Sequence, residues 1–305
     1  MSKILVTGGA GFIGSHIVDE LVAKGHEVVI IDDLSTGQKE NIHPQGKLVE
    51  LNIADPKVKE IFSQEKFDYV FHLAAQIDVR RSVAEPIFDA ETNIIGGLNI
   101  LENCKNFNIK KVIFSSTGGA IYGDTKIIPT PEEHREEPIS PYGICKLALE
   151  KYLRFYYETF GLPYMILRYG NVYGPRQNAK GEAGVVAIFI NKILAGEEPI
   201  INGDGEQTRD YVFVRDVARA NLLALEKGGA DIFNVGTEKA TSVNQVFQLI
   251  NSSFGNQIKE KHGEAKKGEQ RTSCLSFGKI KNSLGWSPEM ELEKGIKETV
   301  EWFRR

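Results

Sequence analysis

The first thirty residues of the chain constrain its fold more than any other segment. An apolar run at 3–7 leads into Gly8, Gly11 and Gly14, then into a helical pattern of apolar residues and a second apolar run at 28–31. Glycines at this spacing permit a tight turn, and they let backbone N–H groups and a helix N-terminus approach a pyrophosphate. The segment therefore predicts a strand, turn, helix and strand unit that binds a dinucleotide.

An acidic pair closes the second of these strands. Asp32 stands where a carboxylate can accept hydrogen bonds from the adenosine ribose hydroxyls, and Asp33 follows it. A 2′-phosphate would meet two negative charges at this point. The pair therefore favours NAD over NADP.

The first half of the chain continues to alternate strand and helix patterns. Helical patterns at about 57–65, 86–105 and 141–160 separate apolar runs that predict buried parallel strands, at 47–51, 69–73, 111–114 and 164–167. We expect an α/β fold, a Rossmann-type doubly wound parallel sheet over residues 1–170. Residues 171–305 should form a smaller α/β substrate-binding lobe, partly interleaved with the first domain, that caps the carboxyl ends of the strands.

Composition excludes several classes of function. The chain has 305 residues and a formal net charge of −4, without a long basic run, so we expect no nucleic-acid partner. Its longest apolar stretch, 185–190, is too short to span a bilayer, and a strand that starts at residue 3 leaves no room for a signal peptide. We therefore expect a cytoplasmic protein without membrane contact. Cys104, Cys145 and Cys274 are widely spaced, which predicts neither disulfides nor a metal site.

A tyrosine and a lysine four residues apart indicate hydride chemistry. Ser140 and Pro141 predict a helix start, so Tyr142 and Lys146 share one helical face. A tyrosine that acts as a base at neutral pH needs a pKa about three units below its usual value, about 4 kcal/mol. A nearby ammonium and a cationic nicotinamide can supply that. An isolated pair at this spacing is typical of an ordinary helix, but the glycine motif favours the catalytic interpretation.

Taken together, these motifs resemble those of the extended short-chain dehydrogenase/reductases, and within them the nucleotide-sugar epimerases. Gly-x-x-Gly-x-x-Gly is the usual spacing in that family. The likeness covers essentially the whole chain and is strongest at 7–14, 32–37, 72–76, 114–123, 142–146, 167–176, 209–211 and 284–286.

The resemblance implies a set of NAD contacts along the carboxyl edge of the sheet. The glycine turn at 8–13 would hold the pyrophosphate, and Asp32 with residues 35–37 would hold the adenosine ribose. Residues 52–53 would meet the adenine, and residues 74–76 would line the nicotinamide side. The implied cofactor-binding residues are Gly8, Gly11, Phe12, Ile13, Asp32, Asp33, Ser35, Thr36, Gly37, Asn52, Ile53, Leu73, Ala74, Ala75, Gln76, Asn93, Ser115, Tyr142, Lys146, Tyr169 and Val172.

The resemblance also implies a substrate side. Thr117 would join Tyr142 and Lys146 as a catalytic residue that binds the reacting sugar hydroxyl, with Ser116 as the alternative register. The implied substrate-binding residues are Thr117, Asn171, Arg209, Glu269, Arg271 and Ser273. Each arginine could instead form a surface salt bridge. Ser273 would leave room for an N-acetyl group, or it could only satisfy a loop backbone group.

The function that the resemblance implies is epimerisation at carbon 4 of a UDP-hexose. UDP-glucose and UDP-galactose would interconvert through a transient 4-keto sugar and bound NADH. Alternatives are an epimerase for UDP-N-acetylglucosamine or UDP-glucuronate, a decarboxylase, and a dehydratase, although resembling dehydratases carry an Asp-Glu pair where Gly118-Gly119 follow Thr117. A catalytically dead dinucleotide-sensing protein is disfavoured because Tyr142 and Lys146 are present. Apolar residues on the 86–105 and 141–160 helices predict a homodimer.

Overall fold

The centre of the molecule is a parallel sheet of seven strands. The computed structural model describes residues 1–178, 184–265 and 270–305. Every pairing in the sheet is parallel, in the order β3-β2-β1-β4-β5-β6-β10. The strands are β1 (Lys3–Thr7), β2 (Glu27–Asp32), β3 (Lys47–Glu50), β4 (Tyr69–His72), β5 (Lys111–Thr117), β6 (Tyr164–Tyr169) and β10 (Asp231–Val235). The predicted Rossmann-type fold is confirmed, with a seventh strand that the sequence did not predict.

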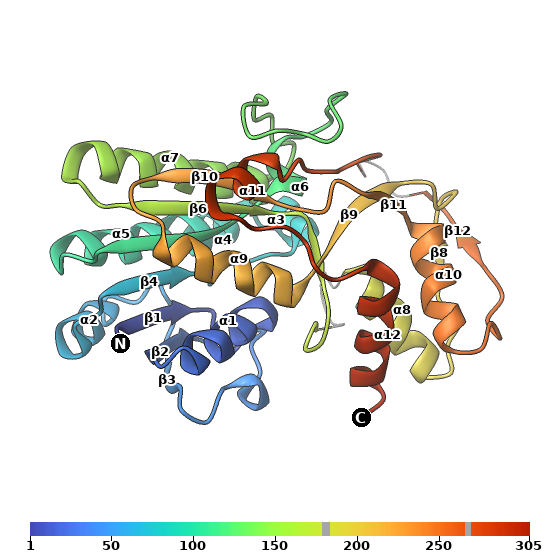
Figure 1. The fold of residues 1–305 in the computed structure, drawn as a ribbon, viewed down its shortest axis with the longest axis horizontal. Helices are drawn as coiled ribbons and strands as arrows, with labels where there is room; N and C mark the ends of the chain where they lie inside the picture. Colours follow the sequence, from blue (N-terminus) through green and yellow to red (C-terminus); the bar gives the residue numbers. More distant parts are fainter. Residues whose placement is uncertain (179–183, 266–269) are drawn as a thin grey trace.

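Helices cover both faces of this sheet, which makes it doubly wound (Figure 1). One face packs against α1 (Phe12–Ala23), α9 (Val214–Glu226) and α11 (Gly278–Leu284). The other face packs against α2 (Val58–Glu65), α5 (Gly96–Asn106) and α7 (Pro141–Phe160). Because both faces are buried, the central strands carry apolar residues at nearly every position, as the sequence pattern indicated.

The helical region predicted at 86–105 contains a change of register. It consists of α4 (Pro86–Ala90), a π-helical segment η2 (Glu91–Ile95) and α5, and it follows the short helix α3 (Val79–Ala84). Asn93 is buried within the π-helical segment. Insertions of this kind occur often at functional sites because they turn one side chain out of the regular helical order.

Helix α7 has strong boundary signals at both ends. The Ser140 side chain accepts a hydrogen bond from the N–H of Gly143, and Pro141 occupies the first turn. The helix ends at Gly161, whose φ of 73° is in the left-handed region that glycine tolerates. The helix therefore spans the predicted 141–160, and it fixes Tyr142 and Lys146 in its first two turns.

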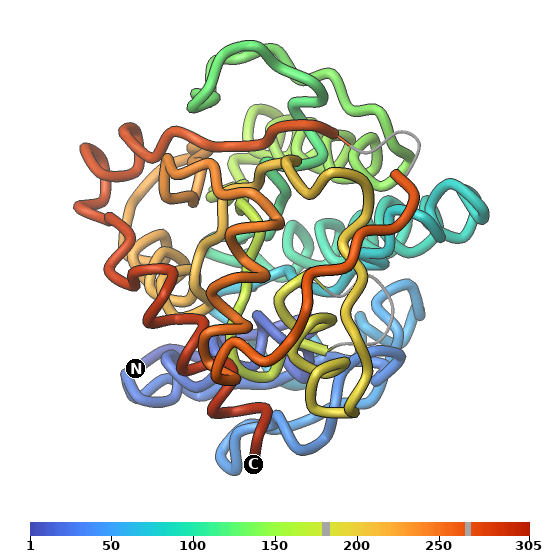
Figure 2. Tube along the Cα trace, turned by 90° about the vertical axis from the view of Figure 1, so that its right-hand side faces the viewer, coloured from blue at the N-terminus to red at the C-terminus, as the bar shows by residue number. Residues whose placement is uncertain are grey.

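A second group of elements follows β6 and lies beyond the carboxyl ends of the strands (Figures 1 and 2). This group contains a three-stranded sheet of β7 (Asn171–Tyr173), β9 (Thr208–Phe213) and β11 (Ala240–Ser242), with β9 in the middle. These strands share a core with α8 (Val185–Leu194), α10 (Val243–Ser253) and α12 (Leu292–Phe303). Short strands β8 (Ile201–Asn202) and β12 (His262–Gly263) pair at the far side. Since β10, α9 and α11 pack with the main sheet, the chain after residue 170 contributes to both layers.

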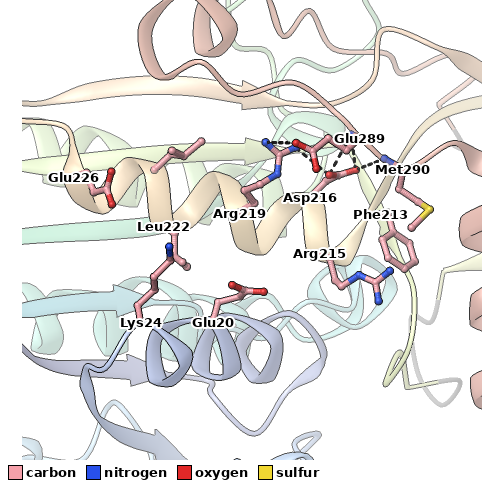
Figure 3. Close-up of a pocket in the computed structure, with 11 residues that line it drawn as sticks. Glu20, Lys24, Phe213, Arg215, Asp216, Arg219, Leu222, Glu226, Glu289 and Met290 are labelled. Atoms are coloured by element: carbon pink, nitrogen blue, oxygen red, sulfur yellow. Dashed lines mark hydrogen bonds and ion pairs between the residues drawn. The ribbon is translucent and has the colours of Figure 1, made fainter. Parts of the chain in front are cut away.

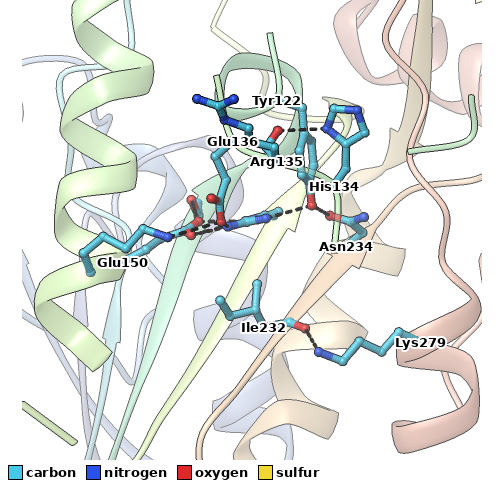
Figure 4. A network of polar contacts seen from close by, with 11 residues as sticks. Tyr122, His134, Arg135, Glu136, Glu150, Ile232, Asn234 and Lys279 are labelled. Atoms are coloured by element: carbon cyan, nitrogen blue, oxygen red, sulfur yellow. Dashed lines mark hydrogen bonds and ion pairs between the residues drawn. The ribbon is translucent and has the colours of Figure 1, made fainter. Parts of the chain in front are cut away.

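A buried ion pair ties α7 to the sheet. Arg168 on β6 is fully buried, and its Nε lies 3.0 Å from Oε1 of Glu150 on α7. Its guanidinium also donates to Glu136 and to the Tyr122 hydroxyl, and Ser116 donates to Glu150. Figure 4 shows Glu150, Glu136 and Tyr122 of this network, with Glu150 on α7. The surrounding carboxylates raise the pKa of Arg168 although burial opposes them.

Arg168→Met should destabilise the protein strongly. Methionine fills a similar volume but leaves the buried Glu150 carboxylate without its counter-ion, which costs about 3 to 5 kcal/mol. Urea denaturation followed by circular dichroism measures the loss. Arg154→Met removes an exposed arginine from α7, paired with Glu158, and should leave the midpoint unchanged. Equal midpoints for the two variants would contradict this account.

Candidate active site

The sheet has its topological switch point between β1 and β4. The chain runs from β1 to β3 on one side and then crosses to β4, so the loops after β1 and β4 diverge at their carboxyl ends. Ligands bind in such crevices in open α/β sheets. A Cβ on Gly8, whose φ is +72°, would lie 2.7 Å from the backbone nitrogen of Ala74. The two loops can approach this closely only because residue 8 is glycine.

The glycine turn and the start of α1 fit a pyrophosphate. The Gly11 N-cap has no side-chain cap, so the first N–H groups of the helix, at Phe12 and Ile13, face the turn with their partial positive charge. A Cβ on Gly14 would lie 2.1 Å from the Gly8 carbonyl oxygen, so the turn packs directly on the helix. The predicted positions Gly8, Gly11, Phe12 and Ile13 are thus brought together at one helix end.

Asp32 is buried at the end of β2 and organises the adjoining loop. Its Oδ2 accepts from the N–H of Ala10, and its Oδ1 accepts from the N–H of Leu34, each at 2.9 Å. Burial raises the pKa of the carboxyl, and these hydrogen bonds oppose the rise. The carboxylate oxygens have further lone pairs, so the donor set fits ribose hydroxyls as well.

Asp33 connects the remaining residues of the predicted adenosine side. Its Oδ1 accepts from the N–H and the hydroxyl of Ser35, and its Oδ2 accepts from Asn52 Nδ2 at 2.8 Å. Thr36 is exposed next to them, whereas Ile53 is buried in the core below. The acidic pair, Ser35 and Asn52 therefore form one polar rim at the edge of β2 and β3.

Lys146 lies buried beneath Tyr142. Its Nζ donates to the Ser115 carbonyl at 2.9 Å, and it lies 5.9 Å from the centre of the Tyr142 ring. Burial lowers the pKa of Lys146 to about 8, although nearby acidic groups oppose that fall. The Tyr142 side chain is partly exposed. An ammonium that interacts with a partly exposed phenol can stabilise the phenolate form.

The structure places Thr117, and not Ser116, on the side of the site. The Ser116 hydroxyl is buried and donates to Glu150 at 2.6 Å, within the ion-pair network. The Thr117 hydroxyl accepts from the N–H of Ala120 at the start of α6 (Gly118–Ile121), which leaves its own proton to donate. A Cβ on Gly119 would lie 4.0 Å from Thr117 Oγ1 and 3.8 Å from Ser273 Oγ. Thr117 and Ser273 therefore line one small space.

The loop after β4 brings the predicted nicotinamide-side residues together. The N–H groups of Leu73 and Ala74 donate to Thr7, and the N–H of Gln76 donates to Asn93 Oδ1 at 2.9 Å. Ala75 lies between them and is partly exposed. Thr7 was not among the predicted binding residues, although the glycine motif begins directly after it. It joins β1 to the β4 loop through its hydroxyl.

Two predicted cofactor residues lie on or just after β6. Tyr169 is nearly buried, and its hydroxyl lies 2.9 Å from Ser115 Oγ and contacts Asn221 on α9. Burial raises the pKa of Tyr169 to about 12, so it remains a neutral phenol. Val172 on β7 is partly buried, and it packs against the core between the sheet and helices α1, α9 and α11. Tyr169 therefore supports the floor of the site from within the sheet.

The predicted substrate residues are less concentrated. Asn171 and Arg209 lie on the neighbouring strands β7 and β9, and Arg209 donates to the Thr208 carbonyl. Arg271 is exposed and forms a two-point ion pair with Asp204, at 2.8 Å for each bond, so here the surface salt bridge that the sequence allowed is present. Ser273 is buried, and its backbone N–H donates to the Thr208 carbonyl. Glu269 lies outside the described residues.

A cavity of about 630 Å³ lies between α1 and α9, away from these residues (Figure 3). Its arginines are already paired, since Arg215 donates to both carboxylate oxygens of Glu298 and Arg219 binds Asp216. None of the residues predicted for the cofactor or the substrate lines it. The cavity therefore does not belong to the site at the switch point.

The described residues add three negative findings. They contain no group of histidine, cysteine and acidic side chains that could hold a metal ion. No helix among them combines the length and the apolar character that a membrane crossing needs. Cys104, Cys145 and Cys274 are all free and buried.

Residues 4–236 match the NAD dependent epimerase/dehydratase family, and the chain belongs to that family. The prediction of an NAD-dependent enzyme related to the nucleotide-sugar epimerases is thereby confirmed. Among curated proteins, a UDP-glucose 4-epimerase of Mycolicibacterium smegmatis is 42% identical, over 99% of this chain and 98% of that protein.

Solved structures give the same result. A UDP-glucose 4-epimerase of Thermotoga maritima, crystallised with UDP-glucose, is 53% identical with a TM-score of 0.97, over 99% of this chain and 98% of that one. A UDP-glucose 4-epimerase of Thermus thermophilus, in complex with NAD, is 41% identical with a TM-score of 0.94, over 99% of each chain. The fold and its switch point are thus those of NAD-binding epimerases.

Asp32→Ala should weaken NAD binding about tenfold or more. The change removes the carboxylate that we expect to accept from the ribose hydroxyls, and it also removes the acceptor of the Ala10 and Leu34 N–H groups. Isothermal titration calorimetry measures the dissociation constant, with Glu40→Ala as an exposed control on the same loop. NADP should bind the wild-type protein more weakly than NAD. Tighter binding of NADP would contradict the role of the acidic pair.

Proposed function

We propose that this protein interconverts UDP-glucose and UDP-galactose by epimerisation at carbon 4. The observation that carries the proposal is the buried Lys146 beneath Tyr142, which donates to the Ser115 carbonyl on β5, two residues before Thr117 at the carboxyl end of that strand. The names of its relatives of high identity and full coverage support the same substrate.

The Tyr142 phenolate removes the proton from the 4-hydroxyl and later returns one. The Lys146 ammonium stabilises that phenolate, and its bond to Ser115 fixes its position under the ring. The Thr117 hydroxyl donates to the reacting sugar oxygen and orients it. Bound NAD supplies a hydride acceptor and, in its reduced form, a hydride donor. No net oxidation results, because the hydride that leaves one face of the sugar returns to the other.

The sugar needs space to turn over between the two hydride transfers. The small residues Gly119 and Ser273 leave that space beside Thr117. Binding energy is therefore better placed in the nucleotide part, which holds the substrate while the hexose turns. Asn171 and Arg209, on β7 and β9, are the proposed diphosphate ligands. Two of the five N–H donors of Arg271 are used by Asp204.

Among the alternatives, dehydration has the least support from the geometry. A Cβ on Gly118 would lie 2.3 Å from a methyl carbon of Leu275, so an acidic side chain does not fit there without a shift. UDP-N-acetylglucosamine is a second candidate substrate because Ser273 is small. Glucuronate epimerases and decarboxylases share the same base, so product analysis on several nucleotide sugars separates these activities. A cytoplasmic location stays a prediction.

We further infer a homodimer formed through α4, α5 and α7, which pack side by side (Figure 1). Large apolar side chains are exposed on α4, on η2 between α4 and α5, and on α7, at Ile87, Phe88, Ile95, Ile144, Tyr152 and Phe155. Leu101 and Tyr156, which lie within the two predicted helices, are buried in the core and do not contribute to this surface. An exposed apolar surface that extends over neighbouring helices is typical of an isologous interface.

Tyr142→Phe should lower turnover of UDP-galactose by about a hundredfold or more while NAD binding is retained. Phenylalanine keeps the ring but removes the proton acceptor. A coupled assay for UDP-glucose gives the rate, and calorimetry gives the affinity for NAD. Tyr152→Phe removes a partly exposed hydroxyl from the same helix and should keep wild-type turnover. Near-native activity of a folded Tyr142→Phe protein would overturn the mechanism.

Ile95→Glu should convert a dimer into a monomer. The substitution places a charge within the apolar surface, where a partner helix would bury it. Sedimentation velocity at micromolar concentration distinguishes the two states. Ile200→Glu changes an equally apolar, exposed residue on the other lobe and should leave the dimer intact. A wild-type protein that sediments only as a monomer would contradict the inferred interface.

A further inference from the structure

The mechanism above leaves one fully buried carboxylate unused. Asp89 on α4 has no exposed surface, and its Oδ1 accepts from Gln76 Nε2 at 2.8 Å and from Asn93 Nδ2 at 3.0 Å. Gln76 belongs to the predicted nicotinamide side of the site, and Asn93 is a further predicted cofactor-binding residue. Within the residues that the structure describes, Oδ2 of Asp89 accepts no hydrogen bond. A buried charge in this position needs a compensating charge nearby.

The Lys146 ammonium is a buried positive charge, and it needs a negative charge nearby. The ammonium donates one hydrogen bond to the Ser115 carbonyl and has the rings of Phe114 and Tyr142 around it. Two acidic groups act on it, namely Asp89 on α4 and Glu150 one turn further along α7. Glu150 is already neutralised by Arg168, through bonds to both of its carboxylate oxygens. Within the described part of the chain, no ion pair within 4.0 Å joins Asp89 to any cation, so its charge acts on Lys146 from a longer distance.

Two other titratable groups near Lys146, His72 and Cys145, are neutral and so supply no counter-charge to its ammonium. His72 on β4 is buried, and burial together with the Lys146 charge lowers its pKa to about 3, so it is neutral. Burial, followed by the neighbouring Asp89, raises the pKa of Cys145 to about 12, so the thiol is neutral as well. Asp89 is therefore the first acidic group that opposes the loss of the Lys146 proton.

We propose that Asp89 is a positioning residue of this site, which aligns Gln76 and Asn93 through one oxygen and supplies the counter-charge of the Lys146 ammonium. The proposal joins two sides of the site through a single buried group. The proposal depends on the proposed catalytic role of Lys146 in one respect only, the pH dependence of kcat. The charge relation between Asp89 and Lys146 can be tested on the protein without any turnover.

Asp89→Asn separates the two roles. An asparagine keeps an oxygen that can accept from Gln76 and Asn93 but removes the charge. The pKa of Lys146 should fall by about one unit, as read from the ¹³Cε chemical shift of the lysine that is missing in Lys146→Met. The alkaline limb of kcat should move to lower pH by the same amount, because turnover needs the ammonium. Glu91→Gln removes an exposed acidic charge two residues away and should move neither.

A folded Asp89→Asn protein with a wild-type Lys146 titration would overturn the proposal. If Asp89→Asn alone does not fold, urea denaturation of Lys146→Met and of the double variant decides. In Lys146→Met the buried carboxylate of Asp89 has lost its counter-charge. The proposal therefore requires that adding Asp89→Asn to Lys146→Met costs no further stability. A double variant less stable than Lys146→Met would overturn it. Activity in Tyr142→Phe would instead contradict the proposed function and leave the NMR result unaffected.

Discussion

The close approach of the β1 and β4 loops at Gly8 is the constraint on which the site depends. Only a residue without a side chain allows the turn to pass this close to the Ala74 nitrogen, because a Cβ there would lie 2.7 Å from it. Thr7 then holds the β4 loop by its hydroxyl, and that loop in turn positions Gln76 against Asn93. The loops predicted to hold the pyrophosphate and the nicotinamide thus depend on the same contact between backbones.

Two acidic residues, Glu150 and Asp89, interact with the buried positive charges of Arg168 and Lys146. Arg168 neutralises Glu150, so the acidic residue closest in sequence to Lys146 is not available to it. The carboxylate of Asp89, on a different helix, also acts on the lysine. If Asp89 supplies the counter-charge as proposed, the stability of the core and the protonation of Lys146 depend on two separate acids, which mutations can address one at a time.

Sequence patterns were sufficient for the elements that obey a simple period. Six parallel strands, helix 141–160 and the glycine turn could be predicted because apolar spacing and caps specify them locally. Strand β10 was missed because its short run contains Asn234 and an acidic first residue, and only its neighbour β6 makes it a strand. The sequence also could not decide between Ser116 and Thr117 as the residue that faces the site. Both carry a hydroxyl group, and only the fold shows that Ser116 donates to Glu150. Asp89 carries no motif at all, and its environment arises from the packing of α4 on α7.

The path of the chain between the two layers has a consequence for how the protein unfolds. The backbone leaves the sheet after β6, returns from β9 into α9, and leaves again from β10 into β11. It crosses back for α11 and ends in the outer lobe with α12. Neither layer is a continuous piece of sequence, so no single cut in the chain separates one layer from the other. We therefore expect the two layers to unfold as one cooperative unit.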